Sequence, residues 1–478
     1  MKNFIFLFLL AILYNTNLFA QKILTINDAV AIALEKSFTI QSSKHTLLSA
    51  QNSFDAVRMG FRSSINLEFD LPRYSRTLSS QFNPLLGSDQ FFSVGNTTFE
   101  GRLRVNQPLL FSNGTLAITG SIFGRDQFNV SSSSSRDYFS NLSIQLRQPL
   151  FSFNSQLASL RRSEISFEKM KRNYTQAERD LIFNVTSSFL NLYKTKKSLE
   201  ITEEKVKQTE ESYSTAMSKY KAGLIAEVDA LQLEVDYASS KNELLNSRQM
   251  FEEAKNEFKI LIGLGLNEDF DINIQLDYTP IILDNESITK KALENRIDLL
   301  NAEFELELNR ITIDEINSLN SIKVEVNASY GLNKNDDLLA NIFKHFGESR
   351  SVTITVSVPV FDWGKNSLSA DAAATNLKIA ELSKENLKKQ ITKEILSAVN
   401  KINSAKARVE ILNKSVDIAE KSYSISVERF KTGNVTSFNL SQIQLKLTDT
   451  KLNSLNAVID YYIAIADLER KSFAKIAH

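Results

Sequence analysis

The sequence predicts a mainly α-helical protein with a smaller set of amphipathic β-strands, built as two copies of one plan. Two stretches of 67 residues, 156–222 and 366–432, contain neither Gly nor Pro, as long helices require. Six shorter stretches alternate apolar and polar residues, as strands with two different faces do. The segment "RQPLFSFN" at 147–154 also returns as "VPVFDWGK" at 358–365, which indicates an internal repeat.

The composition excludes several classes of function. The formal net charge is zero, so the chain has no excess of Lys and Arg to neutralise the phosphates of a nucleic acid. It has no Cys, which excludes disulfides, thiolate metal sites, cysteine nucleophiles and a lipid anchor on Cys. His45, His345 and His478 match no metal-ligand spacing, and there is no Gly-rich phosphate loop or nucleophile elbow. We therefore expect no metal, no cofactor, no nucleic-acid partner and no enzymatic activity.

Residues 1–20, "MKNFIFLFLLAILYNTNLFA", have the pattern of a cleaved secretory signal peptide. A Lys precedes an apolar run, and Ala20 stands before the expected cut. Leu18 is not the small residue preferred near such a cut, so an N-terminal membrane anchor stays open as the alternative. No later stretch approaches the ~20 apolar residues of a transmembrane helix. The sequence therefore predicts a periplasmic protein, a secreted protein or an outer-membrane β-barrel.

Two fixed offsets relate the halves of the chain. An offset of 210 carries "KYKAG" at 219–223 onto "RFKTG" at 429–433, and an offset of 259 carries "LEKSFTI" at 34–40 onto "LENRIDL" at 293–299. The two offsets differ by 49, which means that the first half holds 49 additional residues between its first and last strands. The predicted organisation is a first repeat at 21–266, a linker at 267–286 and a second repeat at 287–478.

The first repeat is expected to contain a helix, four strands and a hairpin of two long helices. The helix begins after Thr25, which can cap it, with Asp28 in the first turn. The segments 74–96 and 131–137 are expected to be loops, and "NG" at 113–114 is expected to be a tight turn. The predicted elements are a helix at 26–62, strands at 64–72, 98–109, 114–128 and 138–150, a long helix at 153–222 and its partner helix at 224–262.

The second repeat is expected to follow the same plan with two strands. Gly223 and Gly433 end the long helices, because glycine adopts the left-handed conformation beyond a helix end most easily. Helical pattern resumes within a few residues, so each Gly is the predicted tip of a helical hairpin. The predicted elements are a helix at 287–318, strands at 321–331 and 350–360, a long helix at 364–432 and its partner helix at 434–473.

Each predicted strand has one apolar and one polar face. A half-buried sheet in a soluble sandwich gives the same pattern. Each strand is also about as long as a tilted strand that crosses a bilayer, with apolar side chains outward and polar ones inward, and the export signal favours the membrane. In a barrel, the lumen-facing charged residues are expected to be Glu68, Asp70, Arg102, Arg104, Arg147, Lys323 and Glu325.

Taken together, these motifs resemble the TolC-like outer-membrane efflux proteins over essentially the whole mature length. The resemblance is carried by "LTINDAVAIALEKS" at 24–37, "ALENRIDLL" at 292–300, the strand-exit motifs "QPLF" and "VPVF", and the tips "YKAGLIAEVDAL" and "FKTGNVTSFNLSQ". It implies a homotrimer with one shared transmembrane β-barrel in the outer membrane, continued by a long periplasmic α-helical barrel. Such a protein is a passive exit duct of a tripartite efflux or type I secretion system, working with a periplasmic adaptor protein and an inner-membrane transporter that acts as pump.

The resemblance also implies roles for particular residues. The hairpin tips would dock the adaptor, the positions just beyond them would line the periplasmic aperture, and the strand exits would mark the boundary of the membrane lipid. Where familiar members carry acids in the second hairpin, this chain has Asn439 and Gln442. The implied residues are Tyr220, Gly223, Phe430 and Gly433 at the tips, Glu227, Asp229, Asn439 and Gln442 at the aperture, and Pro149, Phe151, Pro359, Phe361 and Trp363 at the membrane boundary.

Two alternatives stay open. Six strands per chain would give an eighteen-strand barrel in a trimer, whereas the 49-residue insertion could instead lie outside a twelve-strand barrel. A periplasmic or secreted coiled-coil scaffold with a β-sandwich head would also fit the alternation, and it would conduct nothing.

Overall fold

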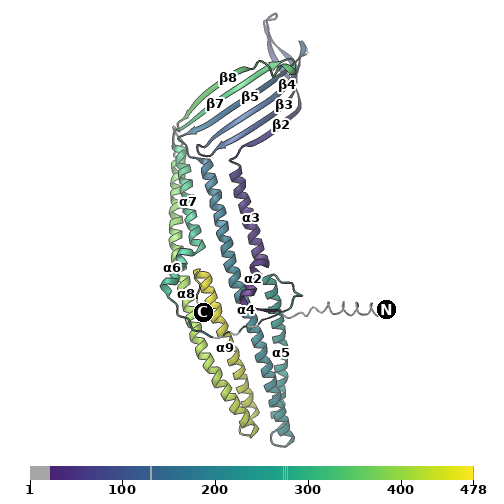
Figure 1. The fold of residues 1–478 in the computed structure, drawn as a ribbon, viewed down its shortest axis with the longest axis vertical. Helices are drawn as coiled ribbons and strands as arrows, with labels where there is room; N and C mark the ends of the chain where they lie inside the picture. The colour runs from purple at the N-terminus through teal and green to yellow at the C-terminus, as the bar shows by residue number, and fades with distance from the viewer. Residues whose placement is uncertain (1–21, 130–131, 273, 275, 277, 477–478) are drawn as a thin grey trace, which may run out of the picture. The chain divides into compact units, whose positions relative to one another are not determined.

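The computed structural model describes residues 22–129, 132–272, 274, 276 and 278–476, so the predicted signal peptide lies outside the described residues. The chain forms two compact units. One contains the residues up to Leu47, Lys171–Leu300 and the residues from Lys384 onward, and the secondary structure of its described residues is helical apart from one small sheet. The other contains Leu48–Met170 and Asn301–Ser383, and it holds a six-stranded sheet (Figure 1).

The six-stranded sheet is antiparallel throughout, and its order is β2-β3-β4-β5-β7-β8. Figure 1 shows β2 and β8 at its two edges. The 49-residue insertion therefore contributes β3 and β4 to the interior of the sheet. The strands are β2 (Ser64–Asn83), β3 (Ser88–Leu109), β4 (Gly114–Asn129), β5 (Ser132–Leu150), β7 (Lys323–Asp336) and β8 (Gly347–Ser357).

The prediction of a loop at 74–96 is wrong. β2 and β3 stay paired from Ser64 opposite Asn106 to Asn83 opposite Ser88, and only residues 84–87 form the turn. The predicted loop at 131–137 likewise belongs to β5 from Ser132 onward, and residues 130–131 lie outside the described residues. In β2 the apolar residues Tyr74, Leu78 and Phe82 recur at every fourth rather than every second position, and residues 132–135 are all Ser, so the alternation that signals a strand fades while the backbone pairing continues.

The strand limits in the second half also differ from the prediction. β7 runs to Asp336 rather than to 331, and β8 begins at Gly347 and ends at Ser357 rather than spanning 350–360. Pro359 therefore lies outside the ladder, which is consistent with its missing N–H. A second sheet, of two strands, pairs β1 (Lys22–Leu24) in parallel with β6 (Phe270–Ile272).

Eight α-helices occur in the described residues, and the helices of the two hairpins match in length and position at an offset of 210. None of the described helices is both long enough and apolar enough to cross a membrane. The helices are α2 (Ile26–Lys36), α3 (Phe38–Met59), α4 (Ser155–Lys221), α5 (Glu227–Ile262), α6 (Asn285–Asn295), α7 (Ile297–Asn317), α8 (Lys365–Lys431) and α9 (Ser437–Ser472).

Single helices at 26–62 and 287–318 are not observed, because each predicted helix is broken once. Ser37 and Arg296 have extended backbone conformations and separate α2 from α3 and α6 from α7. The Ser37 hydroxyl accepts a hydrogen bond from the Ile40 N–H (3.3 Å). The Arg296 guanidinium binds Asp298 (2.7 Å) and Glu394 on α8 (2.9 Å). Contacts distant in the sequence therefore help to hold the second break.

Tyr461 on α9 anchors the segment that joins the two halves of the chain. Its side chain is fully buried among residues of α6, α8 and α9. The hydroxyl donates to the Thr279 carbonyl (2.9 Å) and accepts from the Ile281 N–H (3.1 Å). Its ring meets Tyr278 edge to face, with 5.4 Å between centroids. The segment before α6 is thereby fixed to the helical core.

Replacing Tyr461 with Phe is expected to destabilise the protein by about 1–3 kcal/mol, because two hydrogen bonds to backbone groups, each worth about 0.5–1.5 kcal/mol, are lost. Thermal unfolding followed by circular dichroism in detergent measures the effect. Tyr213→Phe is the matched control, because no described residue forms a hydrogen bond with the Tyr213 hydroxyl and its ring stacks on Tyr237. Equal unfolding temperatures for the two variants would contradict the anchoring role.

Candidate functional site

The two helical hairpins turn at glycine residues with positive φ, which is +71° at Gly223 and +83° at Gly433. At the first tip, the Gly223 N–H donates to the Tyr220 carbonyl (2.8 Å) and the Leu224 N–H to the Lys219 carbonyl (2.9 Å). The second tip repeats both bonds. This paired pattern satisfies the last carbonyls of α4 and α8 and requires a left-handed residue, which Gly provides without strain. The partner helices begin at residues 227 and 437, three residues after the predicted starts at 224 and 434.

The predicted aperture residues lie in the first two turns of α5 and α9. Glu227 and Asp229 occupy the first turn of α5, where a helix N-terminus stabilises negative charge. At the corresponding point of α9, the Asn439 N–H donates to the Thr436 hydroxyl (3.3 Å), which caps the helix. Gln442 is exposed one turn later. Acidic side chains are thus present at the start of α5 and absent from the first turn of α9.

The predicted tip residues Tyr220 and Phe430 occupy equivalent positions but have different environments. Phe430 is 3% exposed and packs in a cluster with Ala216, Ala230 and Leu233 of the first hairpin, whereas Tyr220 is 37% exposed. The Phe430 side chain is therefore covered by the first hairpin in this structure, and its role in docking the adaptor stays a prediction. An apolar ring without a hydroxyl is stabilised by burial, and the first hairpin supplies the surface that buries it.

Lys219 covers Phe430. Its ammonium nitrogen donates to the backbone carbonyl of Phe430 and lies 4.5 Å from the centroid of the ring, the geometry of a cation–π contact. Further from the tip, Lys451 on α9 binds Glu204 on α4 (3.0 Å). These contacts fasten the second hairpin to the first. Sequence reasoning did not identify Lys219, although "KY" at 219–220 and "RF" at 429–430 were visible as a repeated cation–aromatic pair.

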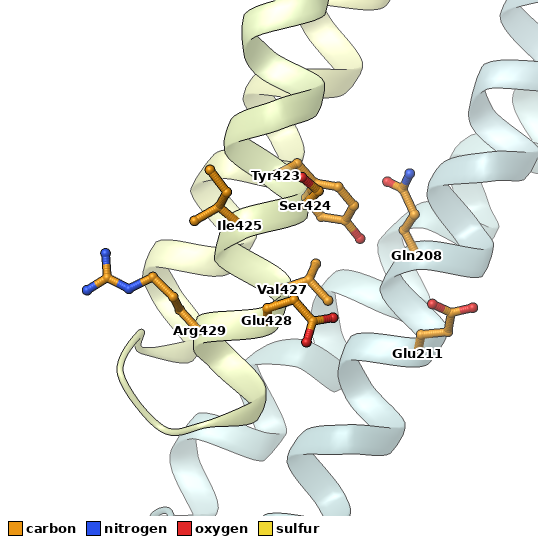
Figure 2. A pocket seen from close by; sticks show the side chains of 8 residues that line it. All are labelled: Gln208, Glu211, Tyr423, Ser424, Ile425, Val427, Glu428 and Arg429. Atoms are coloured by element: carbon orange, nitrogen blue, oxygen red, sulfur yellow. The ribbon is translucent and has the colours of Figure 1, made fainter.

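An open groove of about 660 Å³ lies beside α8 near the tips. Figure 2 shows Gln208 and Glu211 from α4 on one side, with Tyr423 and Glu428 from α8 facing them. Burial, followed by the nearby carboxylates of Glu211 and Glu204, raises the pKa of Tyr423 to about 12, so its hydroxyl stays neutral at physiological pH. Within the described residues, no group of three or more His, Asp or Glu is placed to hold a metal ion. The groove is a seam between helices with a mixed polar and apolar lining.

In the sheet, the pairing register brings the seven charged residues predicted to face the lumen onto one face. Glu68 lies opposite Arg102, and the Arg102 guanidinium also binds Glu100 (2.7 Å). Arg147 on β5 binds Glu325 on β7 (2.8 Å). The opposite face carries apolar side chains that are largely exposed in a single chain, including Leu67 (62%) and Val352 (72%). One face thus carries charges of both signs, and the other is apolar.

The predicted membrane-boundary residues lie where strands end. β5 ends one residue after Pro149, and Phe151 then takes φ = +56°. After β8 and Pro359, the exposed rings of Phe361 and Trp363 meet edge to face, with 4.8 Å between centroids. Near such an exit, Asn154 donates to the Leu110 carbonyl (2.7 Å) and accepts from the Leu157 N–H (2.9 Å), so it links the β3–β4 turn to the start of α4. Sequence reasoning missed Asn154, which follows the quoted "QPLF" motif.

Comparisons with known proteins agree with this architecture. The profile of the family described as "Outer membrane efflux protein" matches residues 115–264 and 288–471. The "Outer membrane protein TolC" of Vibrio cholerae is 19% identical over 336 residues, covering 68% of this chain and 75% of the relative. The Campylobacter jejuni CmeC outer membrane channel superposes with a TM-score of 0.69 at 14% identity, over 93% of this chain and 85% of that one. The Vibrio cholerae outer membrane protein VceC gives 0.68 at 13% identity, over 94% and 96%. The resemblance is thus confirmed: the chain belongs to the outer membrane efflux protein family and is an outer-membrane exit duct for efflux.

Proposed function

We propose that three copies of the chain form one shared eighteen-strand barrel in the outer membrane, continued in the periplasm by a barrel of their long helices. The duct is passive. It conducts small molecules or polypeptides that an inner-membrane transporter delivers through a periplasmic adaptor. The observation that carries the proposal is the six-stranded sheet with one exposed apolar face, one charged face and two edges.

The edges of the sheet support closure between copies. Among the described residues, β2 pairs only with β3 and β8 only with β7, so each outer edge presents unpaired N–H and C=O groups. In lipid such groups have no water to bind, and only a closed barrel satisfies them. Pairing of β2 from one copy with β8 from the next closes the sheet. Because the insertion contributes β3 and β4 within the sheet, each copy supplies six strands.

The two faces of the sheet support a lipid-facing exterior and a wet interior. The charged face, with Glu68, Asp70, Arg102, Arg104, Arg147, Lys323 and Glu325, would line a broad lumen that favours neither sign of charge strongly. The scaffold with a β-sandwich head is disfavoured, because a sandwich buries its apolar face against a second sheet. In the part of the chain that the structure describes, the apolar face has no such cover.

The two halves are best understood as structural repeats, because α4 and α8, and likewise α5 and α9, begin and end at residues 210 positions apart. The hairpin tips are the proposed docking region for the adaptor. The Gly223 and Gly433 turns remain exposed there, whereas Phe430 serves the contact between hairpins.

The test of the function is the behaviour of the purified mature protein. We expect a trimer that requires detergent, changes its gel mobility on heating, and forms discrete conducting pores in a planar bilayer. A monomer that stays dissolved without detergent would contradict the duct and favour the scaffold.

Replacing Asp229 with Ala is expected to weaken block of these pores by divalent cations at least about fivefold, since a unit charge at about 4 Å in water is worth about 1 kcal/mol. Each trimer would lose three such charges. Single-channel recordings measure the block, and Asn439→Ala, at the equivalent neutral position, is the matched control. Unchanged block in the Asp229 variant would exclude this carboxylate from the aperture.

A further inference from the structure

Each hairpin carries a cation next to an aromatic residue near its tip. The contact between the two hairpins uses only one residue from each of these pairs. Position by position, Lys219 and Tyr220 on α4 correspond to Arg429 and Phe430 on α8. The structure uses Lys219 from the first hairpin and Phe430 from the second, in one cation–aromatic contact. The remaining members are Tyr220 and Arg429, again an aromatic ring and a cation. Here the ring is on the first hairpin and the cation is on the second.

Both remaining side chains are available. Tyr220 is 37% exposed, although its counterpart Phe430 is buried. Arg429 is exposed, and within the described residues its guanidinium has no ion pair or hydrogen bond. Figure 2 shows Arg429 pointing away from Gln208 and Glu211 of the first hairpin. The second hairpin thus presents a free cation on the side that does not face α4.

We propose that Tyr220 of one copy lies beneath Arg429 of the next copy, so that each copy-to-copy seam reproduces the contact made by Lys219 and Phe430 within a chain. The inference rests on the proposed trimer. A head-to-tail contact that is repeated with a rotation that closes generates a ring. The six hairpins of three copies would then form a ring, in which contacts within a chain alternate with contacts between chains. The ligand of the Tyr220–Arg429 surface is therefore a second copy of this chain.

The neighbouring residues show where the match is closest. Ile225 and Tyr213 correspond to Val435 and Tyr423, but all four pack against the same cluster within the chain, so the match offered to a second copy is the Tyr220–Arg429 pair itself. Further from the tip the match fails, because Lys451 and Glu204 correspond to Lys241 and Lys414. The ion pair within a chain would become a pair of like charges between chains. The tip contact is therefore the chemically matched part of the seam between copies.

Because the chain has no Cys, cross-linking can test this contact directly. The Tyr220→Cys/Arg429→Cys variant, treated in the membrane with a short bis-maleimide, is expected to run mostly as a covalent trimer on a denaturing gel. Either single variant should stay at the mass of one chain. The matched control, Lys219→Cys/Phe430→Cys, should be bridged within one chain, as mass spectrometry of the joined peptides would show.

The native mass of each variant, measured by light scattering in detergent, separates the possible failures. A trimer in which the Tyr220 and Arg429 positions fail to cross-link, or cross-link within one chain, would overturn this contact while leaving the proposed duct intact. A monomer would overturn both. As a second measurement, Arg429→Glu is expected to lower the temperature at which the trimer dissociates, whereas Arg429→Lys, which keeps the cation, should restore it. Equal dissociation temperatures for the two variants would also count against the contact.

Discussion

Replacing Ile144 with Arg is expected to prevent accumulation of the protein in the outer membrane, whereas replacing its neighbour Ser143 with Arg is not. Ile144 lies on the apolar face of β5, between Ile118 and Tyr330 of the adjacent strands. Its side chain is 43% exposed in a single chain. An arginine that faces lipid near the midplane of a barrel costs about 2–4 kcal/mol, and a trimer would bear this cost three times.

Ser143 makes a sharp control because it differs by one position and lies on the opposite face of the same strand. Its cross-strand neighbours are Thr119 and Gly331, which are small enough to leave space for the longer side chain. Quantitative blotting of outer-membrane fractions, with and without heating, measures the amount of assembled protein. Equal loss in the two variants would show that the apolar face is not the one that contacts lipid.

Replacing Phe430 with Ala is expected to destabilise the junction of the hairpins by about 3–5 kcal/mol, the usual cost of removing a buried aromatic side chain. The cavity would lie among Ala216, Ala230 and Leu233, and Lys219 would lose the ring that it covers. We expect faster hydrogen exchange in the last turns of α4 and the first turns of α5, although neither helix is changed in sequence.

Phe438→Ala is the matched control, because Phe438 is also near the tip of the second hairpin but is 62% exposed in the chain. Exchange in the α2–β6 region, which belongs to another core of the helical unit, provides an internal reference. If the Phe430 variant left exchange at the end of α4 unchanged, the proposed fastening of one hairpin to the other would be wrong.

The long helices and their tips follow from local chemistry, and for this reason the sequence predicts them well. The absence of Gly and Pro over 67 residues allows an uninterrupted helix, and Gly223 and Gly433 stand where a left-handed residue is required. The polar and apolar faces of the sheet are predictable too, because strand period alone assigns them. Family membership follows from the combination of these features in a repeated order.

Other features depend on contacts between residues distant in the sequence, which local patterns do not reveal. Neither Ser37 nor Arg296 is a helix breaker, and the bond from Arg296 to Glu394 spans 98 residues. Phe430 has a local sequence context similar to that of Tyr220, and only the packing of one hairpin on the other buries it. The extension of β2 and β3 to residues 83 and 88 was hidden because polar residues such as Arg76 and Ser80 interrupt the apolar positions and weaken the strand period.

The number of strands around the pore is the quantity that most directly tests how three chains build one duct. An electron cryomicroscopy reconstruction of the protein in a lipid nanodisc is expected to show a three-fold barrel of eighteen strands, with β2 of each copy paired to β8 of the next. A twelve-strand barrel with β3 and β4 outside it, or a separate barrel or open sheet for each chain, would contradict the shared duct.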